Sequence, residues 1–98
     1  MITIKTTPAF DTWLSGIKDR VTYLRLSRRL DRAQQGNLGD IKSVGEGIFE
    51  MREHFGPGWR MYYVQRGGVV IVLLGGGDKS SQPADIARAV KLAETIEE

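Results

Sequence analysis

The sequence predicts an α+β fold in which an N-terminal strand and a helical hairpin pack on a four-stranded antiparallel meander, with a helix at the C-terminus. Three observations predict it. Two segments with apolar residues at helical spacing follow the first strand, four short alternating segments come next with only glycine-rich turns between them, and an amphipathic segment ends the chain. A chain of 98 residues can bury one core, so we expect a single domain over residues 1–98. We also expect the helices to cover one face of the sheet and to leave part of the other face open.

The first two elements are marked by residues that start and stop them. Residues 1–6 alternate isoleucine with polar residues, which predicts a short strand that stops before Pro8. Thr7 is the expected N-cap of the first helix, with Pro8 at its first helical position. We expect this helix to end near Gly16, because glycine weakens helices.

The second helix, over about residues 19–35, is predicted to be amphipathic and basic. Its apolar side is Tyr23, Leu26, Leu30 and Ala33, and its opposite side is Arg25, Arg28, Arg29 and Arg32. From Lys18 to Arg32 there are six basic and two acidic residues. Such a run indicates an anionic partner, nucleic acid or an acidic protein segment, with an ordinary solvated helix face as the alternative.

Four strands and a last helix complete the predicted fold. The strands are expected over residues 41–44, 48–55, 59–65 and 69–74, and the helix over about residues 83–96 with Ser81 or Gln82 as its cap. The connections between the strands are too short for crossover helices, so the strands should form an antiparallel meander.

Composition excludes several classes of protein. The chain has no cysteine and one histidine, which excludes disulfides and thiolate metal sites and leaves little for a transition metal, so we expect no metal and no cofactor. The longest apolar run, residues 69–74, is too short to cross a bilayer, and the N-terminus lacks an apolar segment behind a basic start. We therefore expect a cytoplasmic protein with no membrane partner.

Charged residues around a Gly-Pro-Gly turn form the strongest candidate site. Arg52 and His54 share one face before the turn, and Arg60 and Tyr62 share one face after it. An arginine fork binds phosphate through paired hydrogen bonds, and an imidazole titrates near neutrality and can move protons. The alternatives are that each arginine pairs with a nearby carboxylate such as Glu50 and that His54 is an exposed turn residue.

Residues 75–82 are predicted to be a glycine-rich loop between a buried strand and the N-terminus of the last helix. Backbone N–H groups and the helix dipole favour an anion there, and Lys79 would add a charge. The segment lacks the spacing of a phosphate-binding Walker loop, because its lysine follows Asp78. Asp78 instead indicates a local salt bridge or cap.

The order and content of these segments resemble toxins of the RelE/ParE superfamily, most closely the HigB-like addiction-module killer proteins. The resemblance spans nearly the whole chain and lies in Arg32 with residues 36–40, residues 44–47, residues 51–63 and residues 76–82. It implies the toxin component of a type II toxin–antitoxin system. In RelE-like members it implies a metal-independent endoribonuclease that cleaves mRNA in the ribosomal A site through attack of the 2′-hydroxyl.

The resemblance also implies roles for individual residues. By position, Arg60 resembles the strand arginine that contacts the scissile phosphate, Arg52 the arginine that ends the preceding strand, and Lys79 the basic residue after the last strand. The chain lacks the lysine-rich strand of RelE and has no tyrosine from Gln82 onward, so His54 is the remaining candidate for proton transfer. The expected RNA-binding residues are Arg25, Arg28, Arg29, Arg32, Tyr62, Ser80 and Gln82.

The expected partners follow from the same resemblance. They are a cognate antitoxin of helix-turn-helix type, the ribosome with its mRNA, and operator DNA bound through the toxin–antitoxin complex. Two alternatives share the fold and stay open at this point. One is a ParE-like inhibitor of DNA gyrase, and the other is an inactive homologue that acts only as an antitoxin partner or co-repressor.

Overall fold

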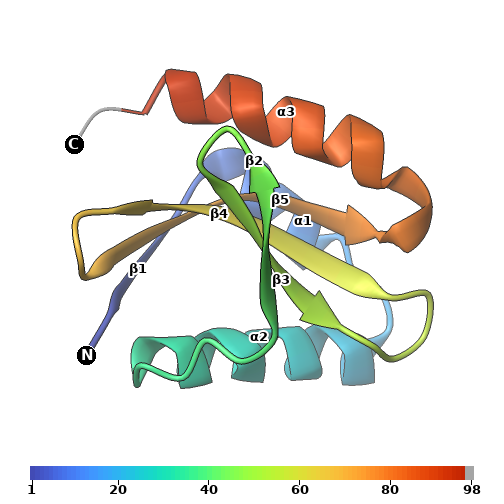
Figure 1. Cartoon of the computed structure of the whole chain (residues 1–98). Helices are drawn as coiled ribbons and strands as arrows, with labels where there is room; N and C mark the ends of the chain where they lie inside the picture. Colours follow the sequence, from blue (N-terminus) through green and yellow to red (C-terminus); the bar gives the residue numbers. More distant parts are fainter. Residues whose placement is uncertain (97–98) are drawn as a thin grey trace.

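The computed structural model describes residues 1–96 and shows a five-stranded mixed sheet with helices on both faces (Figure 1). The strand order is β1-β5-β4-β3-β2. The strands are β1 (Thr3–Thr6), β2 (Ile41–Gly45), β3 (Ile48–Glu53), β4 (Trp59–Arg66) and β5 (Val70–Asp78). The predicted antiparallel meander of β2 to β5 is confirmed. The N-terminal strand, however, joins that sheet as a fifth, edge strand, parallel to β5, rather than packing on a four-stranded sheet.

The predicted Thr7 cap of the first helix is confirmed, and the second helix is capped by Asp19. Helix α1 is Pro8–Ser15, and the Thr7 hydroxyl accepts a hydrogen bond from the Phe10 amide at 3.2 Å. Helix α2 is Arg20–Gln34, and the Asp19 carboxylate accepts from the Thr22 amide at 3.0 Å. Each cap satisfies a backbone donor that has no partner inside the helix, which fixes where the helix begins.

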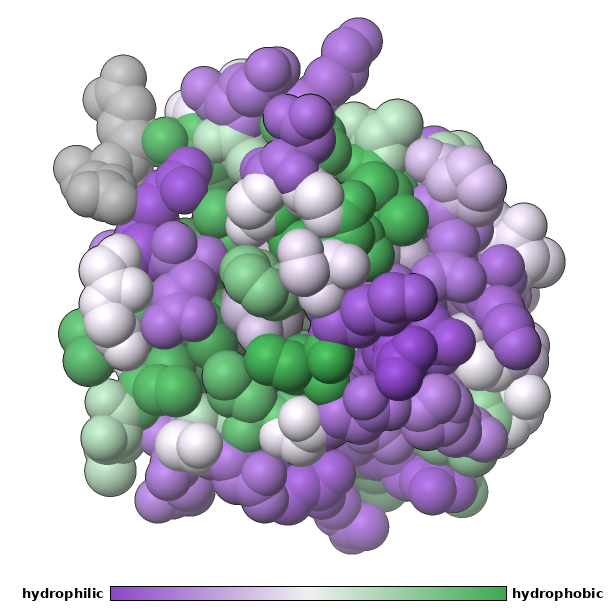
Figure 2. All heavy atoms as spheres, in the orientation of Figure 1, coloured by the Kyte–Doolittle hydropathy of each residue, from purple (hydrophilic) through white to green (hydrophobic). Residues whose placement is uncertain are grey.

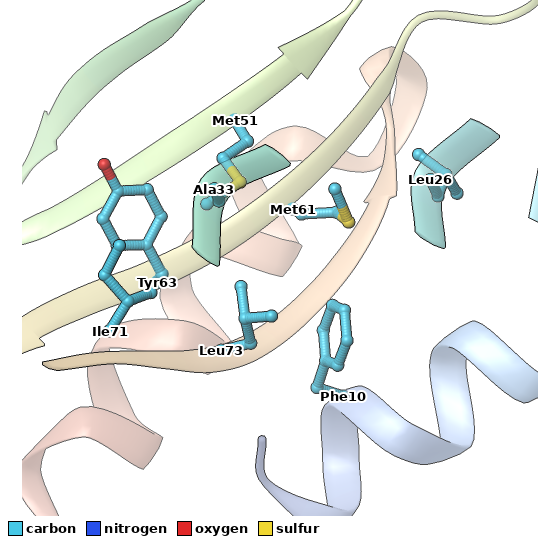
Figure 3. Close-up of a cluster of buried hydrophobic side chains, with 8 residues drawn as sticks. All are labelled: Phe10, Leu26, Ala33, Met51, Met61, Tyr63, Ile71 and Leu73. Carbon is cyan, nitrogen blue, oxygen red and sulfur yellow. The ribbon is translucent and has the colours of Figure 1, made fainter. Parts of the chain in front are cut away.

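Two apolar clusters lie on opposite faces of the sheet. The first, between the sheet and helices α1 and α2, contains Phe10, Leu26, Ala33, Met51, Met61, Tyr63, Ile71 and Leu73 (Figure 3). The second, under helix α3 (Gln82–Glu94), contains Ile48, Tyr62, Val64, Val72, Leu74 and Ala89. The prediction that helices cover only one face is therefore wrong. Strands β4 and β5 are apolar on both faces, so both faces must be covered.

The glycines at residues 75–77 belong to strand β5, not to the predicted loop. Gly75 and Gly77 lie opposite Tyr62 and Arg60 of β4. A Cβ on Gly76 would lie 2.5 Å from the Trp13 ring, and a Cβ on Gly77 would lie 1.9 Å from an oxygen of Asp85. Glycine is needed at both positions because α1 and α3 approach the strand too closely for any side chain.

The inward side of α2 confirms the prediction at Leu26 and Ala33 and differs from it at Tyr23. Its buried residues are Thr22, Leu26, Arg29 and Ala33, whereas Tyr23 is exposed. The four buried residues recur at helical spacing and therefore share one side of the helix. Arg29 lies on that inward side, among them. None of the helices in residues 1–96 has the length and apolar content needed to cross a membrane.

Candidate active site at the end of strand β3

Three polar side chains meet where strand β3 ends, and we call them the Asp40 cluster: Asp40, Arg52 and His54. Arg52 donates to Asp40 through Nε at 3.3 Å and Nη2 at 3.1 Å. His54 Nε2 lies 2.5 Å from Asp40 Oδ2, and 62% of the His54 side chain is exposed. One carboxylate thus holds an arginine and the only histidine of the chain at the surface.

The electrostatics of the cluster fix the proton positions on His54. The pKa of Asp40 is lowered, first by its hydrogen bond with His54 and then by that with Arg52. Asp40 is therefore ionised at neutral pH and can only accept hydrogen bonds. In the neutral imidazole, Nε2 must then carry the hydrogen, which leaves Nδ1 with a free lone pair. A side chain held in that tautomer can accept a proton from a substrate hydroxyl.

Arg29 lies beneath the cluster and joins the segments that carry it. Only 4% of Arg29 is exposed. Its guanidinium donates to the Leu38 carbonyl at 2.8 Å, the Asp40 carbonyl at 2.7 Å and the Arg52 carbonyl at 2.8 Å, and it pairs with Glu53. Arg29 therefore has no free surface for the expected RNA contact. It positions the backbone of Asp40 and Arg52 instead.

Arg60, the second expected phosphate ligand, lies in a buried polar cluster with Glu50, Tyr62 and Gln82. Arg60 is 5% exposed, and its Nε lies 3.9 Å from Glu50 Oε2. Gln82, the first residue of α3, donates to the same Glu50 oxygen at 2.9 Å. Arg60 is the register partner of Arg52, but each guanidinium faces its own carboxylate. The predicted convergence of both arginines on an open face is wrong, because Arg60 is buried beside Glu50.

Tyr62 also lies under α3 and does not form part of an exposed RNA surface. It is fully buried, and its hydroxyl has no hydrogen-bond partner among the described residues. Burial raises the pKa of Tyr62 from 10.0 to about 12, because the interior disfavours the phenolate. The expected roles of Tyr62 and Gln82 in RNA binding are therefore not supported by their positions.

Lys79 and Ser80 form a short turn, η1 (Lys79–Ser81), between β5 and α3. Lys79 is exposed. Its Cβ and the Arg60 Nη1 both lie near Gly58, in the turn after β3. They are 3.4 and 3.6 Å from the position that a Cβ on Gly58 would take. Ser80 is held by Asp78, whose carboxylate accepts from the Ser80 amide at 2.8 Å. The prediction of Asp78 as a local cap is confirmed, and the hydrogen bonds with Ser80 lower its pKa.

The exposed arginines of α2 add positive charge next to the Asp40 cluster. Arg25, Arg28 and Arg32 are exposed. The guanidinium of Arg25 lies over the Phe55 ring, 3.9 Å from its centre. Figure 2 shows hydrophilic residues along the lower edge of the molecule, where Figure 1 places α2.

Asp40 and Arg29 are the site residues that sequence reasoning missed, one as a turn residue and one as a surface arginine. Strand register could have identified Asp40. Ile41 lies opposite Met51, so the preceding residue lies opposite Arg52 across the hairpin. Helical spacing carried a signal for Arg29, which follows Leu26 by three residues and precedes Ala33 by four.

Comparison with known proteins identifies one relative. The chain is 48% identical over 95 residues to a protein of Haemophilus influenzae that is described only as an uncharacterized protein. The match covers 97% of this chain and 96% of the relative, so the chain belongs to the same family as that protein. No family model and no solved structure matches the chain.

Proposed function

We propose that this protein is the toxin of a type II toxin–antitoxin system and cleaves mRNA on the ribosome without a metal ion. The observation that carries the proposal is the Asp40 cluster, in which Asp40 orients His54 next to Arg52 at the surface. When the 2′-hydroxyl of an RNA attacks the adjacent phosphate, one group must accept the hydroxyl proton, and cations must stabilise the negative charge on the phosphate. The cluster supplies both.

In the proposed reaction, His54 accepts the proton and the exposed cations stabilise the phosphate and bind the RNA. His54 Nδ1 accepts the proton of the 2′-hydroxyl, the 2′-oxygen bonds to phosphorus, and the bond from phosphorus to the 5′-oxygen breaks. The leaving 5′-oxygen takes a proton from water, which leaves a cyclic phosphate and a 5′-hydroxyl. Arg52 and Lys79 stabilise the negative charge that develops on the phosphate oxygens. Exposed Arg28 and Arg32 bind the RNA backbone or ribosomal RNA.

The partners belong to the same proposal. A cognate antitoxin of helix-turn-helix type would cover the basic surface of α2 and the Asp40 cluster, and the complex would bind operator DNA. Covering that surface would block access of RNA to His54. Neutralisation would then need no change in the toxin's fold.

A second function is favoured by one specific observation, the burial of Arg60 beside Glu50. An arginine held in this way does not face a phosphate in solution. This arrangement suits a toxin that binds its target without cutting RNA, such as a ParE-like inhibitor of DNA gyrase, or an inactive homologue that serves as an antitoxin partner.

Sequencing of RNA 5′ ends after brief induction in cells without antitoxin tests the proposal. The informative variant is His54→Gln, because glutamine can still donate to Asp40 but cannot take a proton. Lys5→Ala, a charge change at an exposed residue of β1, is the control. New ends within translated codons should appear with the wild type and the control and vanish with His54→Gln. Growth arrest with a DNA-damage response and no new ends would refute the nuclease in favour of gyrase, and harmless expression would favour the inactive partner.

A further inference from the structure

Arg25 and Phe55 form a cation–π pair beside the Asp40 cluster. The guanidinium carbon of Arg25 lies 3.9 Å from the centre of the Phe55 ring. Phe55 is half-buried and directly follows His54 in the chain, whereas Arg25 is exposed on α2. One side of the guanidinium therefore covers the ring, and the side away from the ring is open to solvent.

We propose that Arg25, held over the Phe55 ring, is a stacking site for one unpaired nucleobase of single-stranded RNA. Splayed bases of single-stranded RNA stack on guanidinium planes and aromatic rings. The contact with Phe55 restrains a side chain that is otherwise flexible, so less conformational entropy is lost when a base stacks on it. The nature of the ligand rests on the proposed function, because that function brings RNA to His54.

The neighbouring residues supply the contacts that a nucleotide needs besides its base. Arg28 and Arg32 follow Arg25 by three and seven residues, so all three lie on one side of α2. Within residues 1–96, neither Arg28 nor Arg32 forms an ion pair with a carboxylate. These arginines can bind backbone phosphates while Arg25 takes the base. An acidic peptide would need only the charges, whereas the aromatic support under Arg25 favours a planar ligand.

The test measures binding of the full chain to a short single-stranded RNA that carries the fluorescent base 2-aminopurine, at low salt. Arg25→Lys keeps the charge and removes the planar group. Arg20→Lys makes the same change at an exposed residue of α2 that has no role in the proposed site, and is the matched control. Wild type and Arg20→Lys should quench the fluorescence and bind alike. Arg25→Lys should lose the quenching and bind about tenfold more weakly, the effect of losing one stacked base.

A second variant and a separate readout keep the outcomes distinct. Phe55→Leu should weaken binding as Arg25→Lys does, with a thermal melt to confirm that the variant is folded. Equal binding by the two lysine variants would show that Arg25 contacts only phosphate and would overturn the stacking site, as would absence of binding by the wild type. Stacking without RNA cuts in cells would leave this site standing and refute the nuclease. RNA cuts in cells together with unchanged RNA binding by Arg25→Lys would support the nuclease and overturn the stacking site.

Discussion

Gly76→Ala tests whether the glycines of β5 are there for close packing of the helices. Three atoms of the Trp13 ring lie 2.5 to 2.6 Å from where the new methyl group would be. Ordinary contact between carbon atoms needs about 3.5–4.0 Å, so the ring must move by about 1 Å. Trp13 contacts Phe10 and Trp59, with ring centres 5.7 and 6.3 Å away, so its movement disturbs the core on that face of the sheet.

The expected cost of this substitution follows from overpacking. Extra atoms in a filled core destabilise by about 1–3 kcal/mol. In a domain of this size, each kcal/mol lowers the melting temperature by about 4–8 °C. We therefore expect Gly76→Ala to lower the melting temperature, measured by circular dichroism, by roughly 10 °C. Unfolding in urea should show a free energy of unfolding that is lower by about 1–3 kcal/mol.

Gly75→Ala is the matched control for this experiment. No atom lies within 4 Å of the position of a Cβ on Gly75, so its methyl group meets open space. Its effect on the free energy of unfolding should stay within about 0.5 kcal/mol. Equal stability of the two alanine variants would refute the packing explanation and return residues 75–77 to the flexible loop that the sequence predicted.

Three further variants test the environments of charged and titrating residues. Arg29→Met should cost about 3–5 kcal/mol in urea unfolding, because it leaves Glu53 and three carbonyl groups without their donor, whereas Arg28→Met should cost under about 0.5 kcal/mol; equal costs would contradict the bridging role. Asp40 has a lowered pKa, so its contribution to stability is present above its ordinary pKa of 3.8 and is lost as pH falls through the lower folded value. The difference in free energy of unfolding between wild type and Asp40→Asn should therefore disappear in acid. A difference that persists there would contradict the contribution of the ionised Asp40 carboxylate. Burial raises the pKa of Tyr62, so stability should fall as pH rises from 10.0 through about 12, and Tyr62→Phe should lack that loss in an alkaline titration.

Much of the fold could be predicted because its signals are local. The cap at Thr7 and the turns between strands each act within a few residues, and the structure has them where the sequence indicates. The strand status of residues 75–78 could not be predicted this way. Glycine has little strand preference, and only pairing with β4 and the approach of α1 and α3 keep this segment extended.

The candidate site was less predictable, because burial of charged residues depends on contacts between distant segments. Residue type suggests that Arg29 and Arg60 face solvent, as most arginines do. The structure instead surrounds Arg29 with carbonyl groups from the segment before β2 and the end of β3, and buries Arg60 beside Glu50. Arg29 pairs with Glu53, twenty-four residues away in the chain, and Arg60 lies beside Glu50 on the neighbouring strand, so no local pattern predicts either pairing.

The division between exposed and buried arginines decides which variants can identify the activity. Replacing Arg60 leaves Glu50 buried without its cation, a change that destabilises the protein whether or not Arg60 contacts RNA. Loss of toxicity in an Arg60 variant would therefore not distinguish a catalytic role from unfolding. Arg52 and His54 are partly or largely exposed, and their ion pairs with Asp40 contribute little to stability. An effect of their variants on RNA cutting, in a protein with unchanged melting temperature, would report on the chemistry itself.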